Sequence, residues 1–290
     1  MSNRLRRLLP KRFRKTELRI PTVRMTGAIL ATGGPLRSTL SLSSVAGPLE
    51  KAFAVKGAPA VAIIVNSPGG SPVQSRLIHR RIRDLAEEHG RPVIVYVEDV
   101  AASGGYMIAC AGDEIVADPS SIVGSIGVVS GSFGFVEAIG KLGIERRLHT
   151  AGRNKATLDP FLPERAEDVE HLKTLQLDVH ATFIDLVKAR RGARLAETDE
   201  LFSGLFWSGA RGLDLGLVDR IGDLRSDLRA RFGPQAKAHL IGAPRGLFGF
   251  RGRGGAGAFT GLDPASLGAG AAREIVATLE ERAVWARYGL

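Results

Sequence analysis

The chain has 290 residues, of which 44% are hydrophobic and 24% are charged. A chain of this length and composition can bury a large core in one or two domains, so it is neither disordered nor membrane-like in bulk. Its single cysteine excludes an internal disulfide and any metal site built from several cysteines. We therefore expect neither a bound metal nor another cofactor.

The net charge of +10 is concentrated at the N-terminus. Residues 1–15 contain seven Lys and Arg residues and no acid, and Pro10 prevents one continuous helix there. This segment can be a solvated arm, a peripheral contact with anionic lipid or a nucleic-acid contact. The body of the chain lacks the basic stripe of a specific nucleic-acid binder, so we expect no specific nucleic acid as partner.

No apolar run reaches the roughly 18 residues that a membrane-spanning helix needs. The basic segment leads into Thr16 and Glu17 instead of an apolar stretch, so the sequence predicts no signal peptide. We therefore expect a protein that is cytoplasmic or peripheral to the inner membrane.

Short apolar runs alternate with helical patterns through the first half of the chain. Strands are predicted at 23–31, 60–65, 92–97, 114–117 and 144–148, and helices at 45–55 and 73–89. A further helix opens at Ser103, and another ends near Gly140. In the helix 73–89, Ile78, Ile82 and Leu85 recur at helical spacing and are expected to face the core.

The second half of the chain is predicted to be mostly helical. A long helix runs from 163 to about 191, with an apolar stripe that includes Val179 and Phe183. Shorter elements follow: a helix after 207–210, a helix at 223–232 and a strand at 236–241. The Gly-rich stretch 246–261 is interpreted as a flexible linker to a terminal helix at 264–287.

The candidate nucleophile is Ser103, which follows the strand 92–97 in a small, Gly-rich turn and precedes a helix. A strand–turn–helix transition of this kind lifts a serine side chain out of the backbone at a helix N-terminus, where free N–H groups favour developing negative charge. The pattern indicates nucleophilic catalysis, although a Ser-Gly turn alone is common.

Two further segments support a catalytic interpretation. Gly69 and Gly70 follow the strand 60–65, and paired glycines let the backbone turn its N–H groups toward a neighbouring site, as an oxyanion hole requires. Lys155 lies in a polar loop after the predicted strand 144–148. A neutral Lys amine can take the proton from a serine Oγ and return it to the leaving amine, with no His or Asp needed.

Four segments together carry a family resemblance. They are, in chain order, Asn66-Ser67-Pro68-Gly69-Gly70, Ala102-Ser103-Gly104-Gly105-Tyr106, Val123-Gly124-Ser125-Ile126-Gly127-Val128 and Gly152-Arg153-Asn154-Lys155-Ala156. Their order and spacing resemble those of the signal peptide peptidase A family of serine endopeptidases over roughly residues 20–225. Any one segment is a weak signal, whereas four in register are a strong one.

The resemblance implies a role for six residues. Ser103 is implied as the nucleophile and Lys155 as the general base, with the hydroxyl of Ser125 orienting the Lys amine. The other three are backbone positions: the N–H groups of Gly70 and Gly104 for the oxyanion hole, and Gly69 for substrate binding.

The resemblance also implies a fold, partners and a domain organisation. The fold is α/β, with stacked ββα units like those of the Clp protease subunit and the crotonases, the active site at the strand ends and helical segments after Lys155. The partners are unfolded or membrane-derived peptides and further copies of the chain in a homo-oligomer. We expect a basic arm at 1–19, a peptidase domain at 20–225 and an extension at 226–290. The usual bacterial member carries an N-terminal membrane anchor, which is not visible here.

Other functions stay open at this point. A crotonase-like acyl-CoA enzyme shares the architecture but needs no serine nucleophile, and a non-catalytic scaffold of the same fold would not need Ser103 or Lys155. His149 is the best candidate base for a Ser–His–Asp triad, although no carboxylate is obviously paired with it. Cys110 is interpreted as a core residue. Ser67 and Ser71 are expected to shape the glycine turn.

Overall fold

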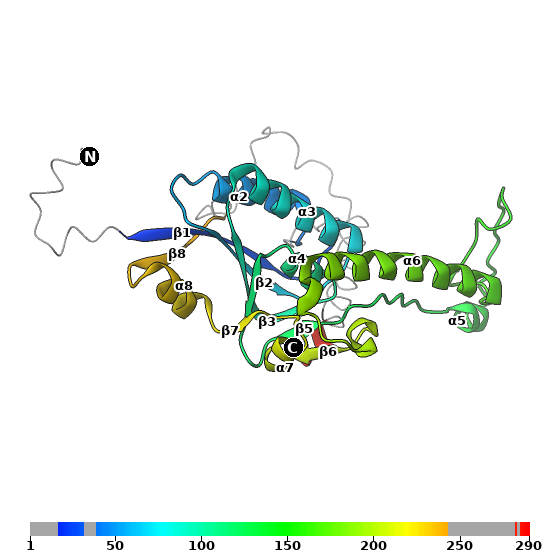
Figure 1. Ribbon diagram of the computed structural model, residues 1–290. Helices are drawn as coiled ribbons and strands as arrows, with labels where there is room; N and C mark the ends of the chain where they lie inside the picture. The colour runs from blue at the N-terminus through cyan, green and yellow to red at the C-terminus, as the bar shows by residue number, and fades with distance from the viewer. Residues whose placement is uncertain (1–16, 32–38, 243–281, 283–284) are drawn as a thin grey trace, which may run out of the picture.

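The computed structural model describes residues 17–31, 39–242, 282 and 285–290 (Figure 1). The basic segment 1–15, the Gly-rich stretch 246–261 and most of the predicted terminal helix 264–287 lie outside the described residues. Within these ranges the chain forms one mixed sheet with helices on both faces, so the predicted α/β class is confirmed.

The sheet has eight strands in the described chain. Their bounds are β1 Leu18–Thr26, β2 Val61–Ser67, β3 Val93–Ala102, β4 Glu114–Ala117, β5 Ile122–Gly124, β6 Phe206–Ser208, β7 Arg220–Ile221 and β8 Ala236–Leu240. The order is β6-β5-β3-β2-β1-β8, with β4 beside β3 and β7 beside β4. All pairs are parallel except β5 with β6. Helices cover both faces, which explains why the central strand β2 and the first half of β3 are continuous apolar runs rather than alternating ones.

The strand β3 has two successive partners on the same side. Its first half, 94–97, pairs with β4, and its end, 100–102, pairs with β5. On its other side, Ala101 is level with Ser67 at the end of β2. The strands β2, β3 and β5 therefore end at the same edge of the sheet, and the loops that follow them lie next to one another.

Helices pack on both faces of this sheet. The larger core lies between the sheet and α2 (Leu42–Phe53), α3 (Pro72–His89), α4 (Gly104–Ala109) and α6 (Ala166–Arg191), and the smaller core lies under α8 (Leu224–Phe232). In α3 the buried side chains include Ile78, Ile82 and Leu85, as the periodicity predicts. This helix begins with Pro72 after the capping hydroxyl of Ser71, and it ends at Gly90 in the left-handed conformation.

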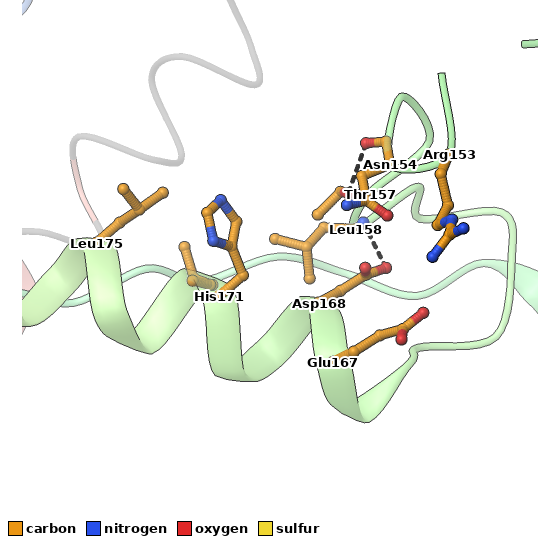
Figure 2. Close-up of a pocket in the computed structure, with 9 residues that line it drawn as sticks. Arg153, Asn154, Thr157, Leu158, Glu167, Asp168, His171 and Leu175 are labelled. Atoms are coloured by element: carbon orange, nitrogen blue, oxygen red, sulfur yellow. Dashed lines mark hydrogen bonds between the residues drawn. The ribbon is translucent and has the colours of Figure 1, made fainter. Parts of the chain in front are cut away.

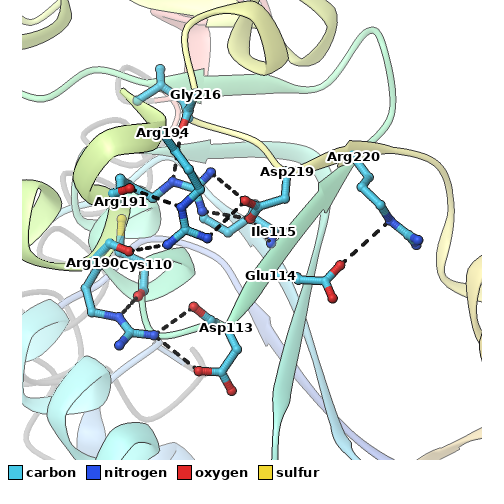
Figure 3. Close-up of polar contacts among 12 residues, drawn as sticks. Cys110, Asp113, Glu114, Ile115, Arg190, Arg191, Arg194, Gly216, Asp219 and Arg220 are labelled. Carbon is cyan, nitrogen blue, oxygen red and sulfur yellow. Dashed lines mark hydrogen bonds and ion pairs between the residues drawn. The ribbon is translucent and has the colours of Figure 1, made fainter. Parts of the chain in front are cut away.

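The C-terminal end of α6 is held to the sheet by buried charges (Figure 3). The guanidinium of Arg191, 2% exposed, forms a bidentate pair with Asp219 at 2.7 and 3.0 Å. The same carboxylate accepts the backbone N–H of Ile115 on β4 at 2.7 Å. Burial alone would raise the pKa of Asp219, because it disfavours the charged carboxylate. The hydrogen bonds and the positive charge of Arg191 outweigh this effect, so the pKa of Asp219 is lowered.

Residues 128–165, which we call the arm, extend from the sheet and return to the start of α6 (Figure 1). The arm contains α5 (Val136–Lys141). Contacts within it include the N–H of Phe135 donating to the Pro160 carbonyl, the ring of Phe135 packing 5.6 Å from that of Phe161, and an ion pair between Arg146 and Asp159 at 2.8 Å. Many of its apolar side chains are exposed, including Phe133 and Leu142.

The structure corrects several predicted elements. The predicted strand at 144–148 is wrong: this segment lies in the arm, where no strand of the described residues pairs with it, and Ile144 is 55% exposed. The first strand begins at Leu18 and ends at Thr26, earlier than predicted, because it pairs with β8 along its first half. The remaining elements are the 3-10 turns η2 (Gly192–Arg194) and η3 (Asp199–Phe202) and the helix α7 (Gly209–Asp214).

Candidate active site

Ser103 stands between the end of β3 and the first turn of α4. Its backbone has φ 52° and ψ −122°, a conformation that residues with a side chain rarely adopt. The Ser103 N–H donates to Gly124 at the end of β5 at 2.8 Å, and its carbonyl accepts the N–H of Met107 at 3.0 Å. The sharp turn is therefore fixed on both sides, and the half-buried side chain of Ser103 faces a pocket.

The turn Gly69-Gly70 lies directly against Ser103. A Cβ on Gly69 would lie 2.7 Å from Cβ of Ser103 and 2.8 Å from the Gly104 nitrogen, so only glycine allows this approach. Gly69 and Gly70 have φ values of 103° and 136°, in the region that favours glycine. The two candidate oxyanion amides, on Gly70 and Gly104, therefore come from two loops that touch.

The Gly69–Gly70 peptide is oriented by hydrogen bonds to residue 29. The Gly69 carbonyl accepts the Ile29 N–H at 2.8 Å, and the Ser71 N–H donates to the Ile29 carbonyl at 2.7 Å. In a trans peptide the C=O and N–H groups point in opposite directions, so the Gly70 N–H points away from Ile29. Within the described part of the chain it has no hydrogen-bond acceptor.

The Gly104 N–H is the second candidate donor. It lies in the first turn of α4, where the amides have no carbonyl of their own helix to bond. An oxyanion hole needs two such donors aimed at one point beside the nucleophile. The structure thus brings Ser103, Gly69, Gly70 and Gly104 together, as the sequence predicts.

Ser125 follows β5 and lies beside Ser103, because Ala102 and Gly124 are paired in register. Ser125 is 5% exposed and has φ 54°, and its N–H donates to Leu205 at 2.7 Å. Its Oγ accepts a hydrogen bond from the hydroxyl of Tyr288 at 3.2 Å. Tyr288 also approaches the carbonyl of Pro68 at 3.5 Å, so one hydroxyl touches both loops that flank the nucleophile.

The pocket at Ser103 has a volume of about 430 Å³ and mostly apolar walls. The apolar lining side chains are Leu30, Met107, Val128, Val129, Val179 and Phe183. Val179 and Phe183 come from the middle of α6, and Arg287 lies at the rim. A mostly apolar cavity therefore adjoins the Ser103 side chain.

Lys155 lies elsewhere in the single chain. Its side chain is exposed, and among the described residues it does not line the Ser103 pocket. Its neighbours Asn154 and Thr157 border a different pocket, against Asp168 and His171 in the first turns of α6 (Figure 2). At a rise of about 1.5 Å per residue, the first turns of α6 and Phe183 lie about 20 Å apart. One copy of the chain therefore does not bring Lys155 to Ser103.

Three other titratable side chains, those of His149, Cys110 and His79, do not line the Ser103 pocket either. His149 is exposed in the arm. Burial raises the pKa of the Cys110 thiol to about 12, so the thiol stays neutral in the core, as predicted. Burial, with the positive charges of Arg190 and Arg83, lowers the pKa of His79 to about 4. In the described ranges, no group of three His, Cys, Asp or Glu residues is placed to hold a metal ion.

Two residues near the site carry no sequence signal. Tyr288 contacts Ser125 although the two residues are 163 positions apart in the sequence, so no local sequence pattern predicts the contact. The ring of His180 on α6 lies 3.0 Å from the Ile126 carbonyl and supports the loop after Ser125.

Comparisons with known proteins agree with this geometry. A family model described as peptidase family S49 matches residues 86–233, just over half of the chain. A Synechocystis protein described provisionally as a protease is 30% identical over 207 residues, which is 71% of each chain. The chloroplastic serine protease SPPA of Arabidopsis thaliana is 34% identical over 212 residues, 71% of this chain and 31% of that protein.

Two Brucella proteins match over nearly the whole chain. The one from Brucella abortus, named Na(+)/H(+) antiporter NhaA, is 62% identical over 287 residues, which is 99% of this chain but 39% of that protein. The chain therefore spans about two fifths of the length of these relatives. No helix in the described part of the chain is both long and apolar enough to cross a bilayer.

The resemblance deduced from the four segments is thereby confirmed at the level of the family. The family match includes the loops of Ser103, Ser125 and Lys155, and the fold brings the first two together. This chain belongs to peptidase family S49, a family of serine-type peptidases.

Proposed function

We propose that the chain hydrolyses peptide bonds in unfolded or membrane-derived peptides through an acyl-enzyme on Ser103. The observation that carries the proposal is the Ser103 turn, held at a positive φ against the Gly69-Gly70 loop. The oxygen that becomes negatively charged during attack would lie between the N–H groups of Gly70 and Gly104. Such preorganised donors are commonly a large source of rate enhancement in acyl transfer.

The reaction needs a base, and we propose Lys155. Its neutral amine takes the proton from the Ser103 Oγ as that oxygen attacks the scissile carbonyl, and then gives it to the departing amine. Water, activated by the same amine, hydrolyses the ester and frees Ser103. Ser125 has a hydroxyl beside the nucleophile and is the proposed partner that orients the amine.

We propose that the base comes from a second copy of the chain. Lys155 is exposed at the outer end of α6, whereas Ser103 lies beside the middle of the same helix. The arm also exposes apolar side chains, including Phe133, Val129 and Leu142 at 79%, 68% and 74%, which a neighbouring copy would cover. A homo-oligomer would then complete each site with a residue of its neighbour.

The first test is labelling with a fluorophosphonate probe, followed by peptide mapping. We expect label on Ser103 in the full-length protein, and loss of both label and peptide hydrolysis in Ser103→Ala. The loss should be many orders of magnitude, because the nucleophile itself is removed. Ser120→Ala, at an exposed turn, serves as the control.

The outcome separates the proposal from its rivals. Undiminished hydrolysis by Ser103→Ala would exclude the serine mechanism. A protein that neither reacts with the probe nor cleaves unstructured peptides would point to the acyl-CoA enzyme or the scaffold.

A further inference from the structure

The hydroxyl of Ser67 holds the backbone that presents the oxyanion donor. Ser67 is the last residue of β2 and is fully buried, with 0% exposure. Its Oγ donates to the Gly27 carbonyl at 2.7 Å and accepts the Gly69 N–H at 3.2 Å. One hydroxyl thus joins the end of β1 to the first glycine of the turn.

This contact completes the restraint on Gly69. Its carbonyl is already bound to the Ile29 N–H at 2.8 Å, so with Ser67 both backbone polar groups of Gly69 are engaged. A glycine at φ 103° has wide conformational freedom and would otherwise let the following peptide rotate. The direction of the Gly70 N–H therefore depends on two hydrogen bonds, one to Ile29 and one to Ser67.

We propose that Ser67 is a positioning residue that aims the Gly70 N–H at the reacting carbonyl oxygen. It does not touch the substrate: it lies under the turn, and among the described residues it does not line the Ser103 pocket. Its effect therefore belongs to the transition state, where charge develops on that oxygen, and not to the binding of the peptide. The kinetic part of this inference rests on the proposed function.

Removing the hydroxyl would loosen the donor without deleting it. Loss of a whole oxyanion donor costs about 100- to 1,000-fold in kcat, so Ser67→Ala should lower kcat by about 10- to 100-fold. KM should stay within about twofold of the wild-type value, because ground-state contacts are unchanged. Ser67→Thr keeps the hydroxyl and should recover most of the activity.

Ser121 offers a matched control. It is also buried, at 2% exposure, and its Oγ likewise donates to backbone carbonyls of β3 while accepting the N–H of Asp118 at 3.1 Å. Ser121→Ala should therefore lower the melting temperature in the same way as Ser67→Ala. It should leave kcat unchanged, because Ser121 does not contact the Gly69-Gly70 turn.

The decisive measurement compares a transition-state analogue with a ground-state ligand. A peptide boronic acid forms a tetrahedral adduct on Ser103, and its affinity should fall in Ser67→Ala by the same factor as kcat/KM. An uncleaved peptide should bind Ser103→Ala and the Ser67→Ala/Ser103→Ala double variant equally well. Boronate affinity equal to that of wild type, or an equal loss of kcat in Ser121→Ala, would overturn the assignment.

A second measurement does not depend on activity. In hydrogen exchange followed by mass spectrometry of the full-length protein, Ser67→Ala should speed exchange in the peptide that contains residues 66–71, and Ser121→Ala should not. Unchanged exchange in that peptide would refute the positioning role even if the protein cleaves no peptide. Failure of the wild-type protein to hydrolyse or to react with the probe, with faster exchange in Ser67→Ala, would instead count against the proposed function alone.

Discussion

At the scale of single residues, the site depends on how closely two backbones approach. A Cβ added to Gly69 would lie 2.7 Å from Cβ of Ser103 and 2.8 Å from the backbone nitrogen of Gly104. A methyl group on Gly69 would have to displace one of them. The glycine is needed for two reasons, its positive φ and the lack of space, and each reason can be tested separately.

Gly69→Ala is expected to lower kcat/KM by at least about 100-fold, because the added Cβ displaces Ser103 or the Gly104 amide from the geometry needed for attack. Gly90→Ala is the matched control: Gly90 also has a positive φ of 57°, but a Cβ there meets nothing within 4 Å. Both variants should lose about 1–2 kcal/mol of stability from backbone strain. Steady-state kinetics measures the loss of activity and thermal unfolding measures the loss of stability. A fully active Gly69→Ala variant would show that the close approach of Gly69 to Ser103 is not needed.

The sequence predicts most of the site at this scale because its geometry is local. Ser103, Gly69 and Ser125 each follow a strand end, and parallel strands bring such ends to one edge of a sheet. Lys155 has no such anchor, and nothing in the pattern of its loop indicates where the arm carries it. Tyr288 could not be predicted, since its contact with Ser125 depends on how a distant segment packs.

At the scale of elements, α6 links the core to the arm, and its buried end is held by the pair Arg191–Asp219. The predicted long helix is confirmed, with bounds within a few residues of those expected. The short strands β5, β6 and β7, of three, three and two residues, were not predicted, because pairing with neighbours and not residue preference defines them. The strand predicted at 144–148 is wrong for the opposite reason. Its apolar pattern resembles that of a strand, but none of the strands that the structure describes lies beside it.

Asp219→Asn should destabilise the protein by about 3 kcal/mol, because the guanidinium of Arg191 would stay buried without its charge partner. Asp214→Asn, which affects an exposed pair with Arg211 at 3.4 Å, should change stability by less than about 0.5 kcal/mol. Denaturant unfolding at neutral pH measures both.

The pH dependence of stability provides an independent check on the role of the Asp219 carboxylate. Its pKa is lowered from the model-compound value of 3.8, so its stabilising contribution is present above that value and is lost as the pH falls through the lower folded-state pKa. Below that range, wild type and Asp219→Asn should converge in stability. A constant difference down to the lowest pH would contradict the role of the charge.

At the scale of the whole molecule, the separation of Lys155 from Ser103 leads us to propose that activity requires an assembly of several copies. Ser103→Ala and Lys155→Ala should each be inactive alone. After the two variants are mixed under conditions that allow subunit exchange, about one quarter of the sites would pair an intact Ser103 with an intact Lys155 from a neighbour. Peptide hydrolysis should then reappear at roughly that fraction of wild-type activity.

Sedimentation of the same mixtures supplies the control, because it shows whether subunits associate and exchange. No recovered activity in a mixed oligomer that has exchanged its subunits would mean that each copy closes its own site by moving the arm. Full activity of Lys155→Ala alone would exclude Lys155 as the base and return His149 to consideration.

The packing around Tyr288 has a spectroscopic consequence. The chain has only two tryptophans. Trp207 pairs with Val123 of β5, and Trp285 packs, as Ile122 of β5 does, against the small cluster that contains Tyr288. Intrinsic fluorescence of this protein therefore reports almost entirely on the corner that holds Ser125. A change in emission on adding a peptide, or on raising the protein concentration, would follow events at the site without any attached dye.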